Sequence, residues 1–294
     1  MTEPLKALEL PIKKVFFPDF AFTIPVYQRP YSWTTEQVYE LFNDLTNVLD
    51  TSNMSTRMDD IQPYFLGSIV LIKESGRPDA DVVDGQQRLT TLTILLAILR
   101  DHAEDQQESN AIQNVIFQHG TPVTGDPDRF RLILRRRDAG FFQRVIQERD
   151  GTALLEADPG DLTDSQANIR NNALELKARV AALSAKERSR LAAYVIQRCY
   201  LVIVSASDRD AAYRIFAVTN DRGLDLSATD ILKADIIGQF RDRPADEKKF
   251  TEIWEDLEDN LGRKSFEDLF GHIRMIFIKQ KASKTSYKNS EMVF

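Results

Sequence analysis

The stretch Val82-Val83-Asp84-Gly85-Gln86-Gln87-Arg88-Leu89 decides the fold of this chain, because it joins two apolar segments of different kinds. The segment before it, residues 64–72, is a short apolar run bounded by polar turns, which predicts a buried strand over residues 64–74. The segment after it, residues 89–99, is a longer apolar run, which predicts a buried helix. We therefore expect a strand to end near Asp84, Gly85 to turn the chain, and a helix to begin at Gln86.

The side chains at this junction suit a nucleotide phosphate. A helix N-terminus carries unpaired N–H groups and partial positive charge, and Arg88 adds a guanidinium that can grip two phosphate oxygens. Asp84 is the candidate to bind Mg²⁺ or orient a water, and Gln86 or Gln87 the candidate to position that water or the sugar. The alternative is an Asp-Gly turn before a helix whose Arg88 is exposed. No Gly-x-x-x-x-Gly-Lys-Ser/Thr motif occurs, which excludes a P-loop.

Composition and charge narrow the class of protein. The chain has 294 residues and is 43% hydrophobic, which is ordinary for a globular protein with its own core. Its net charge of −7 argues against general coating of nucleic acid but is compatible with a local basic groove. The lone Cys199 forms no intramolecular disulfide, and the scattered histidines offer no zinc-ligand spacing. We therefore expect a cytoplasmic protein with no structural metal and no membrane segment.

A second motif, Ile24-Pro25-Val26-Tyr27-Gln28-Arg29-Pro30-Tyr31-Ser32-Trp33, is irregular by composition. Its prolines lack backbone donors and stiffen the segment, so it is neither a regular helix nor a regular strand. The rings can stack on a base or sugar, and the polar side chains can grip a nucleic-acid backbone. The candidates for sensing DNA or a base are therefore Tyr27, Gln28, Arg29, Tyr31 and Trp33. The alternative is an aromatic loop that packs on the core and caps the helix predicted from Thr34.

A third motif runs from Phe216 to Lys233. A helix is predicted to end near Asn220, Gly223 supplies a left-handed turn, and Ser227 with Asp230 forms a capping box. Capping explains most of these residues. It does not explain the side chains of Asn220 and Arg222 at the turn.

The remaining sequence indicates an α/β (α+β) protein with a small mixed-sheet core. Other strands are predicted at residues 12–17, 22–24, 81–84, 130–136 and 200–205. Helices are predicted at residues 34–49, 86–104, 138–149, 166–183, 185–198, 209–219, 228–240, 246–261 and 265–281. We interpret residues 1–110 and 200–240 as the core, residues 111–199 as a mostly helical insertion, and residues 241–294 as the start of a helical C-terminal part.

One predicted strand is strongly basic. Period-two alternation over residues 130–136 and their neighbours places Arg129, Arg131, Arg135 and Arg137 on one face. This face is either a solvated strand surface or a patch that contacts DNA.

Taken together, the three motifs resemble the N-terminal domain of the GmrSD family of modification-dependent restriction proteins. The family pattern is Ile-Pro-x-Tyr-Gln-Arg-x-Tyr-x-Trp, then Asp-Gly-Gln-Gln-Arg, then Phe-x-x-x-Asn-x-x-Gly-x-x-Leu-x-x-x-Asp. Residues 24–33, 84–88 and 216–230 match it in order and without a substitution. The resemblance implies a ParB/sulfiredoxin-like nucleotide-binding fold over roughly residues 10–240. It assigns the phosphate site to Asp84, Gly85, Gln86, Gln87 and Arg88, and it brings the other two motifs, with Asn220, Arg222 and Asp230 as nucleotide-binding candidates, into the same cleft.

The resemblance also implies a function, namely binding and hydrolysis of a nucleoside triphosphate with Mg²⁺ in a phage-defence system that acts on modified DNA. Relatives usually carry a C-terminal HNH-type endonuclease domain, and no such motif is visible here. We therefore expect a sensor domain that gates a nuclease outside this chain and does not itself cut DNA. Its expected partners are a nucleoside triphosphate, modified DNA and other restriction-system components. Whether the chain also forms a homo-oligomer is left open.

Two rival functions come from different classes. The first is a DNA-binding module that recognises modified DNA with the same cleft but without nucleotide turnover. The second is a nuclease within this chain, which needs two acidic clusters with metal-ligand spacing, and the sequence contains no convincing pair.

Overall fold

The computed structural model describes residues 6–52, 54–121, 123, 125, 127–158, 160–207, 212, 228–240 and 243–278. The chain divides into two compact units. The first consists of Met1–Pro25 with Pro30–Thr219, and the second of Val26–Arg29 with Asn220–Phe294. The second motif is therefore shared between the two units.

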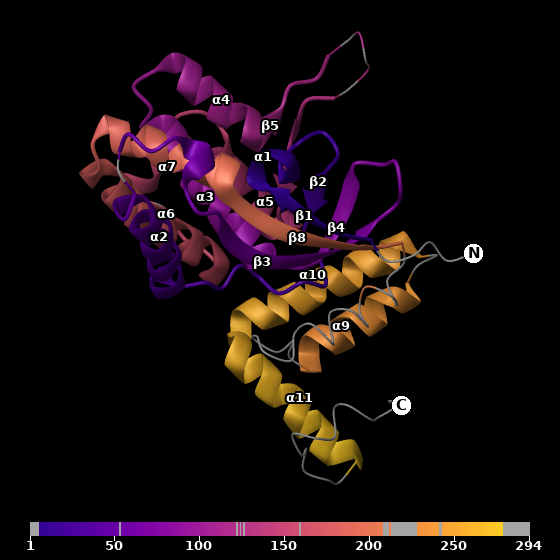
Figure 1. Ribbon diagram of the computed structural model, residues 1–294. Helices are drawn as coiled ribbons and strands as arrows, with labels where there is room; N and C mark the ends of the chain where they lie inside the picture. The colour runs from indigo at the N-terminus through magenta and orange to yellow at the C-terminus, as the bar shows by residue number, and fades with distance from the viewer. Residues whose placement is uncertain are drawn as a thin grey trace. The chain divides into compact units, whose positions relative to one another are not determined.

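A mixed six-stranded sheet forms the centre of the first unit, in the order β1-β8-β3-β4-β2-β7 (Figure 1). The pairs β1/β8 and β3/β4 are antiparallel, whereas β8/β3, β4/β2 and β2/β7 are parallel. The strands are β1 (Lys6–Pro11), β2 (Ala21–Thr23), β3 (Tyr64–Lys73), β4 (Asp79–Asp84), β7 (Leu132–Ile133) and β8 (Cys199–Ala206). A separate hairpin pairs β5 (Phe117–Gln118) with β6 (Arg129–Phe130). The mixed sheet among many helices confirms the predicted fold class.

Helix α3 (Gln86–Asp101) is the central helix of the first unit, and nearly all of its residues are buried. It packs against α4 (Gln106–Ile116), α6 (Asp164–Ala182) and α7 (Ala185–Arg198). Helix α2 (Thr35–Asp50) lies beside α6 and α7 on one side of the sheet (Figure 1). The remaining helical elements are α1 (Ile12–Val15), η1 (Met58–Asp60), α5 (Arg136–Phe142), η2 (Gln143–Gln147) and η3 (Gly151–Glu156).

The described part of the second unit contains three helices, α9 (Ala228–Gln239), α10 (Pro244–Leu261) and α11 (Arg263–Ile278). Trp254 on α10 stacks on Phe270 of α11 with ring centroids 5.1 Å apart. The Lys233 ammonium lies 3.7 Å from the Glu255 carboxylate, and both side chains are buried. Aromatic stacking and this ion pair connect all three helices.

The predicted strand at residues 12–17 is wrong, because residues 12–15 form helix α1 and the strand lies earlier, at Lys6–Pro11. Pro11 ends the strand and stands at the N-cap of α1. Ile12, Val15 and Phe16 are buried together, which is the i, i+3, i+4 spacing of one helix face. Pairing of β1 with β8, far along the chain, places the strand before the proline rather than after it.

The predicted strand at residues 130–136 is also wrong as a continuous element. Arg129–Phe130 pairs with β5, Leu132–Ile133 pairs with β2, and a helix already begins at Arg136. Helix α4 was not predicted, although Asp105 caps it by accepting a hydrogen bond from the Gln107 N–H at 2.7 Å. The helix predicted at residues 209–219 lies outside the described residues except for residue 212.

Candidate functional site

The junction between β4 and α3 has the predicted strand–glycine–helix geometry. Gly85 adopts a left-handed conformation with φ of 96°, and a β-carbon there would lie 2.3 Å from the Ile69 side chain. Both the backbone angle and the close approach of Ile69 therefore require glycine. The Asp84 carboxylate accepts a hydrogen bond from the Gly85 N–H at 2.8 Å, and Gly85 at the N-cap has no side chain that could accept from the first turn of α3. The N-terminus of α3 therefore resembles the helix N-termini at which backbone N–H groups bind anions.

Arg88 is held beside this turn by a bulge in strand β3. The register of β3 against β8 shifts between Phe65 and Ser68, and Gly67 within the bulge has φ of 103°. The Arg88 guanidinium packs over Gly67 and donates from Nη1 to the Ser68 carbonyl at 2.9 Å. Burial lowers the pKa of Arg88, and the nearby Asp84 carboxylate partly offsets that effect. The site therefore combines a fixed guanidinium, a carboxylate and a helix mouth.

Gln87 connects this site to the second motif. Its Oε1 accepts hydrogen bonds from the backbone N–H groups of Ser32 and Trp33, at 2.8 and 3.2 Å. Its Nε2 donates to the Pro30 carbonyl at 3.1 Å. The buried carboxamide of Gln87 is thus hydrogen-bonded at both its oxygen and its nitrogen to the Pro30–Trp33 backbone, so it holds that segment against α3.

A buried hydrogen-bond chain supports the same segment. Asn172 of α6 donates to the Trp33 carbonyl at 2.7 Å and to the Tyr31 hydroxyl at 2.8 Å. Because Thr91 donates its one hydroxyl proton to the Gln87 carbonyl at 2.9 Å, the Tyr31 hydroxyl is the donor in its 2.8 Å hydrogen bond to Thr91 Oγ1. Burial raises the pKa of Tyr31 to about 12, so this hydroxyl remains protonated. This chain of hydrogen bonds therefore joins α3, α6 and the Pro30–Trp33 segment.

Asn172 and Thr91 were missed by the sequence analysis. Asn172 lies three residues after Ile169 on the buried face of α6, where an apolar residue is expected. A polar residue at a core position of an amphipathic helix needs a buried partner, and this is the signal that could have found it.

The other candidates of the second motif differ in burial. Tyr31 belongs to the hydrophobic core and Trp33 packs against it, as the aromatic-loop interpretation predicts. Tyr27 and Gln28 are also buried, and Arg29 is half-buried, but these three residues belong to the second unit. Of the phosphate-site candidates, Gln86 is buried at the first position of α3. Asn220, Arg222 and the side chain of Asp230 lie outside the described residues.

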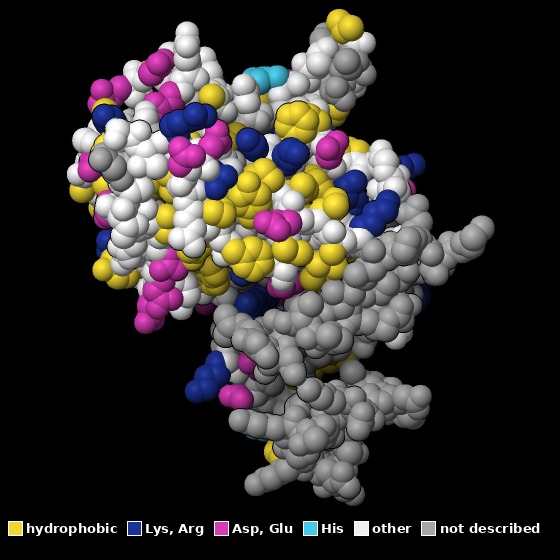
Figure 2. All heavy atoms as spheres, viewed as in Figure 1, with side chains coloured by type: hydrophobic (Ala, Val, Ile, Leu, Met, Phe, Trp, Pro, Cys, Tyr) yellow, Lys and Arg dark blue, Asp and Glu magenta, His cyan; other side chains and the backbone are white. Residues whose placement is uncertain are grey.

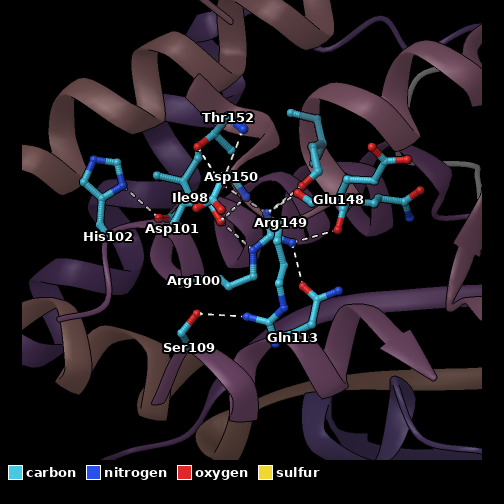
Figure 3. A network of polar contacts seen from close by, with 12 residues as sticks. Ile98, Arg100, Asp101, His102, Ser109, Gln113, Glu148, Arg149, Asp150 and Thr152 are labelled. Atoms are coloured by element: carbon cyan, nitrogen blue, oxygen red, sulfur yellow. Dashed lines mark hydrogen bonds and ion pairs between the residues drawn. The ribbon is translucent and has the colours of Figure 1, made fainter. Parts of the chain in front are cut away.

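A second polar network lies at the opposite end of α3 (Figure 3). Arg100 is fully buried and pairs with Asp101 at 2.6 Å, and it also donates to Gln113 Oε1 at 2.7 Å. Asp101 accepts from the Thr152 hydroxyl at 2.7 Å. Arg100 further donates to three backbone carbonyls at the end of η2, those of Ile146, Gln147 and Glu148. These bonds engage the guanidinium internally, so the network anchors α3 and is not a binding site.

Charge on the surface is unevenly distributed (Figure 2). Acidic and basic side chains are interspersed over α4 and α7, whereas basic side chains lie over α1, which carries the exposed Lys13 and Lys14. Across the described ranges, no group of three or more His, Cys, Asp or Glu side chains is placed to hold a metal ion. Asp84 therefore offers a carboxylate without the rest of a protein-only metal site.

The first unit is a mixed-sheet α/β domain. The family model of the GmrSD restriction endonuclease N-terminal domain matches residues 12–237, and the chain belongs to this family, as the three motifs predicted. No curated protein matches the chain. Among the described helices, none is both long and apolar enough to cross a bilayer.

Proposed function

We propose that this protein binds and hydrolyses a nucleoside triphosphate at the mouth of α3, as the sensor domain of a restriction system that acts on modified DNA. The observation that carries the proposal is the placement of Arg88 over Gly67, beside the first turn of α3 and the Asp84 carboxylate. The helix N–H groups and the guanidinium supply donors for phosphate oxygens, where negative charge accumulates during phosphoryl transfer. Turnover at this site would gate a nuclease.

The residues present fit a Mg²⁺ ion that arrives with the nucleotide. Such an ion typically takes one or two carboxylates together with phosphate oxygens and waters, and Asp84 at the end of β4 supplies one carboxylate. When bound, the ion would neutralise charge on the phosphates. The Asp84 carboxylate also accepts a hydrogen bond from the Gly85 N–H. One side chain would therefore both stabilise the turn and supply an oxygen to the metal ion.

The second motif suits the role of a sensor because its two halves have different attachments. The Pro30–Trp33 backbone is hydrogen-bonded to Gln87 of α3, the residue immediately before Arg88. Tyr27, Gln28 and Arg29 directly precede this fastened half in the chain. A ligand that moves residues 27–29 would therefore pull on the Gln87 contacts and alter Arg88.

Release of phosphate by the purified chain tests the activity directly. Wild type, Arg88→Ala and Arg88→Lys should be compared with each nucleoside triphosphate, with and without Mg²⁺ and DNA. Loss of a charge-assisted contact to a transferring phosphoryl group costs about 3 kcal/mol, so Arg88→Ala should lower turnover on the order of 100-fold or more. Arg88→Lys should also fail, because an ammonium lacks the planar fork. Arg77→Ala, at an exposed arginine, is the matched control.

Calorimetric titration separates the rival function from the proposed one. If nucleotide binds but no phosphate is released under any condition, the domain is a sensor without turnover. If modified DNA binds while no nucleotide does, the DNA-binding module is the correct function. Wild-type turnover by a well-folded Arg88→Ala protein would contradict the assignment of the site.

A further inference from the structure

Arg131 has a buried guanidinium group whose positive charge is poorly compensated by neighbouring groups. Only 5% of the residue is exposed, and its Nη1 donates to Gln118 Oε1 at 2.5 Å. Its Nε is buried and has no hydrogen-bond partner among the described residues. Arg129 donates from Nε to the same Gln118 oxygen at 3.2 Å. Two guanidinium groups therefore share one neutral acceptor.

The arrangement follows from the pairing of β5 with β6. Gln118 and Arg129 are cross-strand partners, and Arg131 lies two residues further along, on the same face of the hairpin. Backbone hydrogen bonds hold Arg131 on both sides, from the Phe22 N–H to the Arg131 carbonyl at 2.8 Å and from the Arg131 N–H to the Ile116 carbonyl at 2.9 Å. The convergence of two arginines is thus built into the backbone register.

The electrostatics of this cluster favour an anion. Burial, together with the charge of Arg129, lowers the pKa of Arg131 to about 10, yet the group stays protonated at neutral pH. Within the described part of the chain, the acid recorded beside the cluster is Asp79, 3.9 Å from Arg129 Nη1, and its side chain is 81% exposed. A solvent-exposed carboxylate at that distance compensates weakly. A buried charge without a counterion is costly, and a bound anion would remove that cost.

We propose that Gln118, Arg129 and Arg131 form a second anion site that takes the oxygens of a phosphate group. Paired guanidinium forks match the geometry of a tetrahedral phosphate. The site is distinct from the one at Asp84–Arg88, because it adjoins Asp79 at the start of β4 whereas Asp84 ends that strand, roughly 17 Å away. The phosphate belongs either to a nucleic-acid backbone or to a free phosphate compound, and neither source requires hydrolysis at α3.

Thermal unfolding in different salts tests the site. The full chain should be heated in sodium phosphate and in sodium chloride at matched ionic strength, as wild type, Arg131→Met and Arg136→Met. Phosphate should raise the Tm of wild type and of Arg136→Met. Because Arg136 is exposed, its replacement controls for the loss of one positive charge. Arg131→Met should lose that increment and be at least as stable as wild type in chloride, because an uncompensated buried charge is removed.

A second variant and a DNA arm complete the test. Arg129→Met, which changes a less buried side chain, should reduce the phosphate increment even if Arg131→Met does not fold. Binding of a DNA duplex should be measured across salt concentrations. If the DNA backbone is the source, each variant should lower the slope of log K against log salt by about 1, and if the slope is unchanged, the source is a free phosphate compound. A wild-type Tm that is equal in both salts, or a full phosphate increment in both variants, would overturn the proposal.

Discussion

Gly67 and Arg88 lie in direct contact, although they belong to a strand and to a helix that begins two elements later. A β-carbon at Gly67 would lie 3.0 Å from Nη2 of Arg88, and Gly67 also has φ of 103°. The bulge that contains Gly67 presents the Ser68 carbonyl to Nη1 of the same guanidinium. Placement of the proposed catalytic arginine therefore depends on a glycine outside the Asp-Gly-Gln-Gln-Arg motif.

Replacing Gly67 by alanine should remove nucleotide hydrolysis. The added methyl group displaces Arg88, and the left-handed backbone costs a further 1–2 kcal/mol, roughly, for a residue with a side chain. Gly76→Ala is the matched control, because Gly76 also has positive φ but nothing within 4 Å of its β-carbon. Both variants should lose similar stability in urea, while only Gly67→Ala loses phosphate release. Equal activity in the two variants would show that Arg88 placement does not matter.

Asp84→Asn should keep the fold but not the activity. Asparagine retains an oxygen that can accept from the Gly85 N–H, so the turn survives while the negative charge beside Arg88 is removed. We expect turnover to fall and its dependence on Mg²⁺ concentration to weaken, as measured by phosphate release over a Mg²⁺ titration. Asp79→Asn, at the exposed opposite end of β4, should behave as wild type. Normal Mg²⁺ dependence in Asp84→Asn would remove Asp84 from the metal role.

Gln87→Met should loosen the second motif. Methionine preserves the side-chain length but makes none of the three hydrogen bonds to the Pro30–Trp33 backbone, which leaves part-buried backbone groups without partners. The free energy of unfolding should fall by about 1–3 kcal/mol, and tryptophan emission should change because Trp33 lies in the released segment. Gln106→Met, at an exposed position of α4, is the control. Unaltered emission with lost hydrolysis would instead favour a direct catalytic role for Gln87.

Arg100→Met should be severely destabilising, in contrast to Arg131→Met. Both arginines are buried, but Arg100 is bonded to Asp101, Gln113 and backbone carbonyls, and its removal strands all of these groups. Breaking a buried ion pair from one side commonly costs about 3–5 kcal/mol. Urea unfolding of the two variants side by side measures the difference. Similar losses in both would mean that Arg131 is compensated after all.

The purified chain should leave plasmid DNA intact in Mg²⁺ or Mn²⁺. The expectation rests on the absence, among the described residues, of any three-residue group of metal-ligating side chains. Agarose electrophoresis after prolonged incubation is sufficient to measure it. Metal-dependent cleavage that disappears on substitution of a residue within this chain would support the alternative that the chain itself is a nuclease.

Local signals account for what the sequence alone predicted correctly. The junction from β4 to α3 was predictable because an apolar strand, a glycine and an apolar helix are each encoded by adjacent residues. The start of α2 was predictable for the same reason, since Thr34 and Gln37 form a capping box within one turn. The order of the three motifs was sufficient to identify the family.

The partners of those residues were decided only by the tertiary structure. Pairing with β8 moved the first strand to Lys6–Pro11, and pairing with two different strands divided the basic segment around Arg131. The hydrogen bonds from the Gln87 carboxamide to the Pro30–Trp33 backbone could not be read from the sequence, because these residues lie more than fifty positions apart. The physical reason is that hydrogen-bond partners and strand neighbours depend on which distant segments pack together, whereas helix and turn formation depends on residues a few positions apart.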